Sequence, residues 1–280
     1  MSPHARDRAR DKRRAQKRQN VLERRAMESR RNKQVLGVVL ALAVVIGGFV
    51  WLTSAMNTGD ATTGAQASAR AGSPVASAPP ALAKPVAGCS AAPALPNDKR
   101  TRTLPDKKIA AGKTFTASIM TNCGVITVEL DGAKAPQTVA SFIGLAESGY
   151  WADSPCHRLT TPAQGISVLQ CGDPTGTGQG TPGYGFGVEN APANFSYPAG
   201  TLAMARTSDP KSNGGQFFIV YKQTVLNDPT GYTIFGKITK GLDIVERVAA
   251  AGATPEDANK NTAPLQPISI LAVNVTEKKA

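Results

Sequence analysis

Acidic residues are scarce in this 280-residue chain: 20 Asp and Glu stand against 32 Lys and Arg, giving a formal net charge of +12. The imbalance is local, because residues 1–34 hold 13 basic and 4 acidic residues, while the other 246 residues carry a net charge of only +3. The basic segment also lacks aromatic residues and any nucleic-acid-binding motif. We therefore expect no nucleic-acid partner and interpret residues 1–34 as a basic cytoplasmic tail.

Charge is absent altogether from residues 35–52, VLGVVLALAVVIGGFVWL. A run of this length is about the minimum for a helix that spans a bilayer, and it has no polar stripe of the kind that a soluble helix shows. We predict a single transmembrane helix in contact with membrane lipid. Because the cations precede it, we expect the N-terminus in the cytoplasm and the rest of the chain outside the cell membrane. The long leader and a weak cleavage site at Thr53 and Ala55 favour an uncleaved anchor over a cleaved signal peptide.

Large apolar side chains are few in residues 53–112, which are rich in Ala, Pro and Ser. Such a segment buries too little apolar surface to offset the entropy of ordering, so it predicts a flexible linker. We assign residues 113–280 to one folded domain.

Helical patterns are rare in that domain. They are confined to residues 135–149 and 241–252, whereas alternating segments such as 114–130 and 268–275 predict short strands. Many strands with two helices predict a closed antiparallel sheet capped by helices. The glycine-rich residues 176–187 open no helix, so they do not predict a phosphate site.

One predicted strand, in SNGGQFFIVY at residues 212–221, carries a polar amide among large apolar residues. Side chains alternate across a strand, so Gln216 and Phe218 share one face while Phe217 and Ile219 share the other. One of these faces can be buried core. An amide beside an apolar ring on the second face is what a peptide-binding surface requires.

A second predicted strand repeats this pattern, with Val168 and Gln170 two residues apart. Arg158 lies across the expected hairpin from them. The segments CHRL, VLQCGD, GTLAMAR, NGGQFFI and YTIFGKITKGLDIVE occur here in the order and spacing of cyclophilin-type peptidyl-prolyl cis-trans isomerases. The chain resembles bacterial membrane-anchored members of that family over about 160 residues.

The resemblance implies an all-β-dominated fold, a closed eight-stranded antiparallel β-barrel capped by two α-helices, with the substrate groove on its outer face. It implies a monomer that binds proline-containing segments of exported proteins and needs no cofactor or metal. The catalytic residues that it implies are Arg158, Gln170, Gln216 and Phe218. The substrate-binding residues that it implies are Val168, Gly176, Ala205, Arg206, Thr207, Leu226 and Tyr232.

The sequence departs from the family pattern at several of these positions. Ser167 stands where the family usually has a Phe of the pocket wall. Val225 replaces a Trp that supports cyclosporin binding in the family, so we expect weak inhibition by cyclosporin. Tyr232 replaces a pocket His, and Arg206 replaces an Asn, which favours acidic substrate segments.

Four cysteines follow the predicted membrane helix and permit two disulfides in three pairings. We favour Cys156 with Cys171 and Cys89 with Cys123. Strict strand alternation opposes the first pair, because it sends Cys156 and Cys171 to opposite faces, so a bulge would be required.

Two functions remain open from the sequence. The first is an isomerase for X-Pro bonds of exported or cell-surface proteins, in which Arg158 stabilises the twisted amide above a hydrophobic proline pocket. The second is a membrane-tethered module or chaperone that binds proline-containing peptides with little turnover. The retention of Arg158 favours the first, because binding alone does not require a cation there.

Overall fold

A computed structural model describes residues 85–96, 100–257 and 261–279, all within one unit, Val75–Ala280. The predicted tail, the predicted membrane helix and most of the predicted linker lie outside the described residues. Within the described ranges, no helix combines the length and apolar character needed to cross a bilayer.

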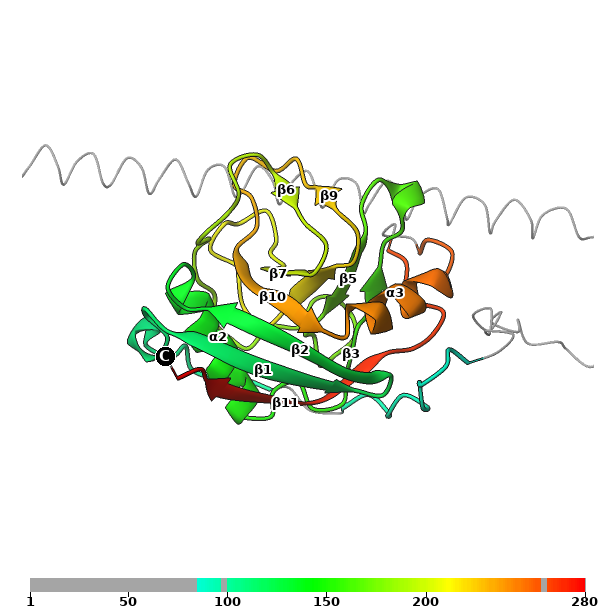
Figure 1. Cartoon of the computed structure of the whole chain (residues 1–280), viewed down its shortest axis with the longest axis horizontal. Coiled ribbons are helices and arrows are strands. Elements are labelled where there is room, and N and C mark those ends of the chain that lie inside the picture. Colours follow the sequence, from blue (N-terminus) through cyan, green and yellow to red (C-terminus); the bar gives the residue numbers. More distant parts are fainter. Residues whose placement is uncertain (1–84, 97–99, 258–260, 280) are drawn as a thin grey trace, which may run out of the picture. The chain divides into compact units, whose positions relative to one another are not determined.

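A nine-stranded sheet forms the body of the domain, in the order β3-β11-β1-β2-β10-β7-β8-β5-β4, with antiparallel pairing throughout (Figure 1). Two further strands, β6 and β9, pair with each other. The strands are β1 Thr114–Thr121, β2 Gly124–Asp131, β3 Ser154–Pro155, β4 Arg158–Leu159, β5 Val168–Cys171, β6 Ser196–Tyr197, β7 Thr201–Met204, β8 Phe217–Val220, β9 Thr224–Val225, β10 Ile234–Lys240 and β11 Ser269–Glu277.

The expected closure of an eight-stranded barrel is wrong: the main sheet has nine strands and curls into a half-barrel with β3 and β4 as its edges. These edge strands follow each other in the chain, but the backbone between them bonds elsewhere. Cys156 N donates to Ile268 O at 2.9 Å, and Leu159 N donates to Thr262 O at 2.8 Å. Only Cys156 and His157 separate β3 from β4, so these two edges cannot lie opposite each other as a ladder, and the backbone donors of this run bond to the segment before β11 instead.

Both predicted helices are confirmed, as α2 Pro136–Glu147 and α3 Leu242–Ala250. Proline stands in the first turn of α2, where its missing N–H costs no hydrogen bond. α2 packs against β11 and β2, and α3 packs against β2. Two short 3-10 helices, η1 Lys107–Ile109 and η2 Pro162–Gln164, complete the helical content of the described residues.

The two faces of β5 and β8 serve different hydrophobic clusters. Leu169, Phe217 and Ile219 belong to the main core inside the curled sheet. Val168 and Phe218 belong to a smaller cluster on the opposite face. The alternation predicted for β8 is therefore confirmed, and the second cluster forms the apolar floor of the candidate site.

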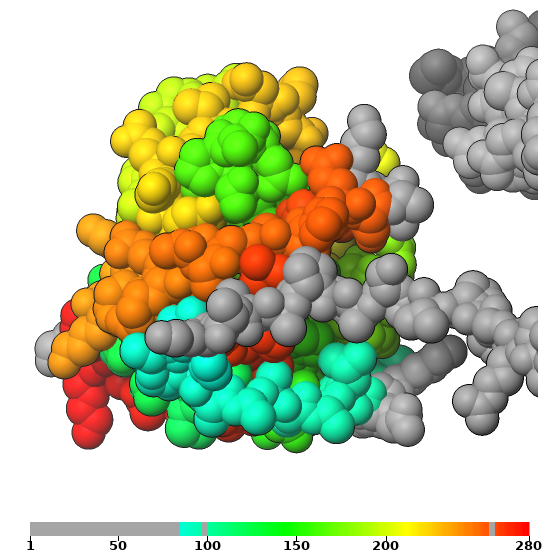
Figure 2. Space-filling view, turned by 90° about the vertical axis from the view of Figure 1, so that its right-hand side faces the viewer, coloured from blue at the N-terminus to red at the C-terminus, as the bar shows by residue number. Residues whose placement is uncertain are grey.

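Residues 85–96 and 100–112, here called the strap, pack on the domain, although the sequence predicted a flexible linker up to residue 112 (Figure 2, cyan). Ser90 N donates to Asn122 O at 2.8 Å. The Arg100 guanidinium donates to the carbonyls of Tyr150 and Ala152 at 2.9 and 2.7 Å. Ala110 is fully buried. Composition missed this segment because hydrogen bonds to distant carbonyls, more than apolar burial, hold it.

The four cysteines form the disulfides Cys89–Cys123 and Cys156–Cys171, the pairing that the sequence favoured. The first ties the strap to the turn between β1 and β2. The objection from strand alternation does not apply to the second, because β4 begins at Arg158 and Cys156 lies before it. No bulge is needed.

Candidate active site

A row of side chains crosses four neighbouring strands on the outer face of the sheet. Arg158 on β4 is paired with Gln170 on β5, Gln170 with Phe218 on β8, and Phe218 with Ala203 on β7. Residues paired in register point to the same face of a sheet. The structure therefore brings the predicted cation, amide and aromatic ring together.

Beside this row lies a cavity of about 120 Å³, large enough for a proline ring. Phe218 and Tyr232 meet edge to face in its wall, with ring centroids 5.6 Å apart. Its lining contains the predicted Val168, Leu226 and Tyr232, and also a residue that the sequence analysis missed; the full set is Arg158, Ile166, Val168, Gln170, Ala205, Arg206, Phe218, Leu226 and Tyr232.

The missed residue is Ile166, which completes the wall that Ser167 left in doubt. Ser167 itself is buried on the other side: its N–H donates to Thr224 Oγ1 at 3.0 Å, and its carbonyl accepts from Tyr221 N at 3.1 Å. Figure 2 shows the segment before β5 (green) beside the segment after β8 (yellow). The signal was present in the sequence, since Ile166 stands two residues before Val168 and alternation gives both the same face.

We expect Ile166→Ala to raise the KM for an Ala-Pro peptide about fivefold, because removing three partly buried carbons loses about 1 kcal/mol of apolar contact with the proline ring. Steady-state kinetics in a prolyl-peptide assay measures this change. Val125→Ala is the matched control, because Val125 is 50% exposed on β2 and does not line the cavity. An unchanged KM in Ile166→Ala would remove Ile166 from the pocket wall.

A chain of hydrogen bonds links the polar residues of the row to a neighbouring loop. Arg158 Nη1 donates to Gln170 Oε1 at 3.4 Å, and Gln170 Nε2 donates to Gln216 Oε1 at 3.0 Å. Gln216 Nε2 in turn donates to the carbonyls of Gly178 and Gly180 at 3.0 and 2.9 Å. The loop that holds these two carbonyls therefore orients both amides.

The Arg158 guanidinium retains donor capacity at the cavity. Its buried Nε has no hydrogen-bond partner among the described residues. Burial lowers the pKa of Arg158, and the nearby Tyr232 opposes this shift. Arginine starts from so high a pKa that the side chain stays cationic at neutral pH. A partly buried cation is thus placed beside the apolar residues that line the cavity.

Asp173 shapes the loop that orients the amides. This fully buried residue accepts hydrogen bonds from Thr175 N at 2.8 Å and from Gly180 N at 3.0 Å. Burial acts to raise the pKa of Asp173, but the hydrogen bonds from Gly180 and Thr175 outweigh it and hold the pKa below its usual value. Position 180 must be glycine, because a Cβ there would lie 1.8 Å from the Asp173 carboxylate.

A larger cavity of about 550 Å³ adjoins the proline-sized one and contains Ala205 and Thr207, as predicted for the groove. Gly178 and Gly180 line it, and Gly176 lines an adjoining polar cavity of about 220 Å³ together with Arg158 and Gln170. The role predicted for Gly176 in the groove stays a prediction.

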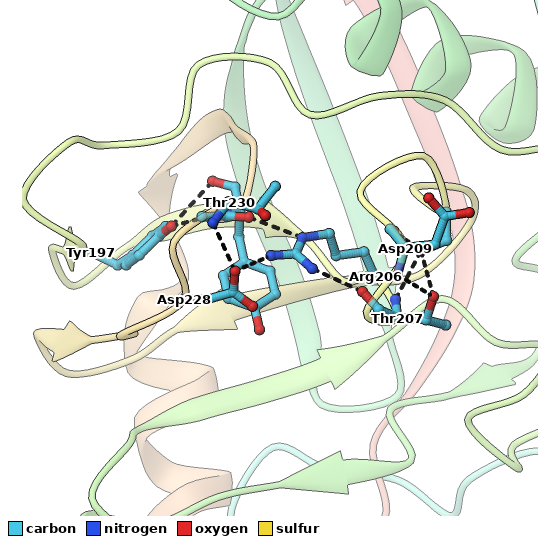
Figure 3. A network of polar contacts seen from close by, with 9 residues as sticks. Tyr197, Arg206, Thr207, Asp209, Asp228 and Thr230 are labelled. Atoms are coloured by element: carbon cyan, nitrogen blue, oxygen red, sulfur yellow. Dashed lines mark hydrogen bonds and ion pairs between the residues drawn. The ribbon is translucent and has the colours of Figure 1, made fainter.

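Arg206 lines both cavities, but its charge is already compensated (Figure 3). Its side chain is only 2% exposed and forms an ion pair with Asp228. The expectation that Arg206 favours acidic substrate segments is therefore not supported by its geometry, because its guanidinium faces an internal carboxylate.

Val225 is 50% exposed on β9, next to the pocket residue Leu226, and does not line the proline-sized cavity. We expect Val225→Trp to strengthen cyclosporin inhibition about tenfold, because an aromatic side chain adds a large apolar contact at the rim. Inhibition curves on both proteins measure the change, with Val125→Trp as control. Equal and strong inhibition of the unaltered protein would contradict the expectation.

Comparisons with known proteins agree with this geometry. Residues 116–275 match the family model described as cyclophilin type peptidyl-prolyl cis-trans isomerase/CLD. The chain is 43% identical over 147 residues to a "Probable peptidyl-prolyl cis-trans isomerase B" of Mycobacterium tuberculosis, covering 48% of this chain and 46% of that protein. It is 42% identical over 166 residues to the protein of the same name in Mycobacterium leprae, covering 53% and 55%.

The chain thus spans about half the length of these curated relatives. A solved Cryptosporidium parvum cyclophilin type isomerase, crystallised in the presence of the dipeptide Ala-Pro, is 30% identical, with a TM-score of 0.48 and coverage of 58% of this chain and 99% of that chain. The family model covers more than half of the 280 residues. The chain belongs to the cyclophilin type peptidyl-prolyl cis-trans isomerase family.

Proposed function

We propose that this protein accelerates cis-trans isomerisation of X-Pro bonds in exported or cell-surface proteins. The observation that carries the proposal is Arg158, which lines a cavity of proline size together with Phe218. An apolar seat can grip the proline ring there while the preceding carbonyl rotates. A cation at the edge of the cavity favours catalysis over binding alone, because a pocket that only binds proline does not need one.

The reaction suits such a site because it requires rotation and no bond cleavage. An X-Pro bond isomerises unaided in tens to hundreds of seconds because the amide resists twisting. Reaching milliseconds requires lowering the barrier by roughly 5 to 6 kcal/mol, at 1.36 kcal/mol for each tenfold. Twisting localises the lone pair on the proline nitrogen, so a guanidinium directed there binds the twisted state better than either planar state.

The remaining residues supply orientation. Gln170 and Gln216 are held by the hydrogen-bond chain that runs to the 178–180 loop, so their polar groups are preorganised to bind substrate backbone. Ala205 and Thr207 form the groove wall for residues that precede the proline. Preorganised contacts reduce the entropy that the substrate must lose before it reaches the twisted geometry.

The location outside the cell membrane is part of the same proposal. It is supported by the uncharged run at residues 35–52 behind a basic tail and by the two disulfides, which form in oxidising compartments. The substrates would then be proline-containing segments of exported proteins. The predicted anchor would keep the enzyme at the membrane where these proteins emerge.

A protease-coupled prolyl-peptide assay on the full chain in detergent tests the proposal. We expect catalysed isomerisation of an Ala-Pro peptide well above the spontaneous rate. No acceleration by folded protein would refute the isomerase. If that protein still bound the peptide in calorimetry, the tethered proline-binding module would be the better description.

A further inference from the structure

Arg206 is bound on every nitrogen of its guanidinium by groups of the protein itself. Nε donates to Gly231 O at 3.0 Å, Nη1 donates to Thr207 O at 2.9 Å, and Nη2 donates to Asp228 Oδ1 at 2.5 Å. The guanidinium carbon also lies 4.8 Å from the centre of the Tyr232 ring, within cation–π range. Figure 3 shows the side chain extended toward Asp228 and away from Asp209.

Three of these four contacts lead to one segment, Leu226–Tyr232, here called the pocket loop. Its two ends, Leu226 and Tyr232, both line the proline-sized cavity. It lies between β9 and β10 outside any strand and folds through its own turn bonds, in which Gly231 N donates to Asp228 O and Thr230 N donates to Asp228 Oδ1. Asp228 thus links the turn of the pocket loop to Arg206. Arg206 lies two residues after the end of β7, next to Ala205 of the groove wall.

The backbone of the loop is also anchored at both ends, and at the Leu226 end Leu226 N donates to Phe195 O at 2.9 Å. Tyr232 N donates to Tyr197 Oη at 2.8 Å, and Tyr197 Oη donates to Tyr232 O at 3.3 Å. Between these backbone anchors, Arg206 holds the turn at Asp228 and lies over the Tyr232 ring, whose edge-to-face partner is Phe218. Gly231 fits this tight arrangement because it has φ +67° and a Cβ there would lie 2.7 Å from Ala191 Cβ.

We propose that Arg206 is a positioning residue that fixes the pocket loop against β7, so that it sets affinity for the proline ring and does not read acidic substrate residues. The proposal rests on the proposed function of this cavity as the proline seat. Arg206 acts through Tyr232 and Leu226 and needs no contact with substrate. Its ion pair with Asp228 makes the site indifferent to substrate charge at this point.

The electrostatics of the cluster are consistent with a permanently formed ion pair. Burial tends to raise the pKa of Asp228, but hydrogen bonds from Thr230 and Arg206 outweigh it, and the pKa lies below its usual value. Asp228 is therefore ionised at neutral pH. Lysine could not replace Arg206, because a single ammonium group cannot serve three acceptors in a plane while it stacks on a ring.

The test compares Arg206→Gln, Arg206→Lys and the isosteric Asp228→Asn with the unaltered full chain. We expect Arg206→Gln to raise the KM for an Ala-Pro peptide about tenfold with kcat changed less than about twofold, because the seat for the ring shifts while Arg158 stays in place. Asp228→Asn should move KM in the same direction, and Arg206→Lys should not restore it. Arg247→Gln is the matched control, since it removes an Arg–Asp pair on the exposed face of α3.

A pair of peptides separates positioning from charge recognition. With Glu-Pro and Ala-Pro substrates, we expect Arg206→Gln to weaken both equally, so that their ratio of kcat/KM equals that of the unaltered protein. A loss confined to the Glu-Pro peptide would overturn the proposal and make Arg206 a reader of acidic residues. An unchanged KM for both peptides would also overturn it.

Binding of an unreactive Ala-Pro probe, followed by calorimetry, keeps this test independent of turnover. If the unaltered protein binds the probe but does not isomerise peptides, the proposed function fails while the role of Arg206 is still decided by the dissociation constants. A tenfold weaker constant in Arg206→Gln and Asp228→Asn supports it, and equal constants refute it. Thermal midpoints that fall equally in Arg206→Gln and Arg247→Gln, without any change in probe binding, would indicate a purely structural ion pair and refute it as well.

Discussion

Replacing Arg158 by Ala is expected to lower kcat/KM for prolyl peptides by about 100-fold to 1,000-fold, the usual loss when one preorganised donor to a transition state is removed. Arg158 on β4 is partly buried and lines the cavity, so its electrostatic effect on the proline nitrogen is only weakly screened by water. The substitution also deprives Gln170 Oε1 of its donor. Both effects act on the twisted state more than on the planar substrate.

To test this prediction, the effect of Arg158→Ala on kcat/KM is compared with its effect on the dissociation constant of an unreactive ligand. We expect the dissociation constant of an unreactive Ala-Pro probe to change less than about threefold in Arg158→Ala, because an arginine that acts on the transition state contributes little to ground-state binding. Arg158→Lys should fall between the two proteins, since it keeps the charge and loses the planar fork. Arg247→Ala, on the exposed face of α3, serves as the control and should match the unaltered enzyme.

Two results would count against this mechanism. Unchanged kcat/KM in a folded Arg158→Ala protein would exclude a catalytic role. A loss of probe affinity as large as the loss of turnover would show that Arg158 binds substrate and transition state alike. Far-UV circular dichroism and the thermal midpoint establish that the variant is folded.

Asp173→Ala should cause the second large effect, a loss of about 3 kcal/mol in the free energy of unfolding. The substitution leaves the backbone donors Thr175 N and Gly180 N, whose hydrogen bonds are partly buried, without their acceptor, and an unsatisfied group costs about 1–3 kcal/mol where burial keeps water from it. The carbonyls of Gly178 and Gly180 would then move, and Gln216 would lose its acceptors. We therefore expect kcat/KM to fall about tenfold at a temperature where the variant remains folded.

Urea unfolding measures the stability loss. Asp106→Ala is the matched control, because Asp106 also accepts from the backbone N–H two residues on, at 2.9 Å from Lys108 N, but is exposed. An equal loss in the two variants would show that burial and the groove loop give Asp173 no special role.

Stability should also depend on pH through Asp173. Its folded-state pKa lies below the unfolded value of about 3.9, so ionisation favours the folded state. This contribution is fully present above the unfolded pKa and is lost as pH falls through the folded pKa. The stability difference between the unaltered protein and Asp173→Asn should consequently shrink below about pH 4. A difference that stays constant down to the acid transition would contradict the assignment.

Local patterns predicted much of this architecture. The two helices lie within the segments expected for them, and the alternation in β8 separates Phe217 from Phe218 between the two clusters. The same alternation, applied to the residue two positions before Val168, would have predicted that Ile166 lines the pocket. Periodicity succeeds here because it depends on neighbours along the chain.

The errors share a different cause. The run that holds both edge strands of the sheet bonds to the segment before β11, where Cys156 N and Leu159 N donate to carbonyls more than 100 residues away in sequence. The strap packs because Arg100 reaches carbonyls about 50 residues further along. Neither partner can be read from composition.

The sequence by itself determined the family, the two helices and the face that carries Arg158, Gln170 and Phe218, because spacing and alternation specify which side chains a strand or helix presents together. Only the tertiary structure decided which partner Arg206 has. The sequence shows that Arg206 carries a charge, but the role of this side chain depends on the partner that folding brings to it. That partner is Asp228, 22 residues away. With Asp228 as its partner, the buried Arg206 cation becomes a support for the proline pocket.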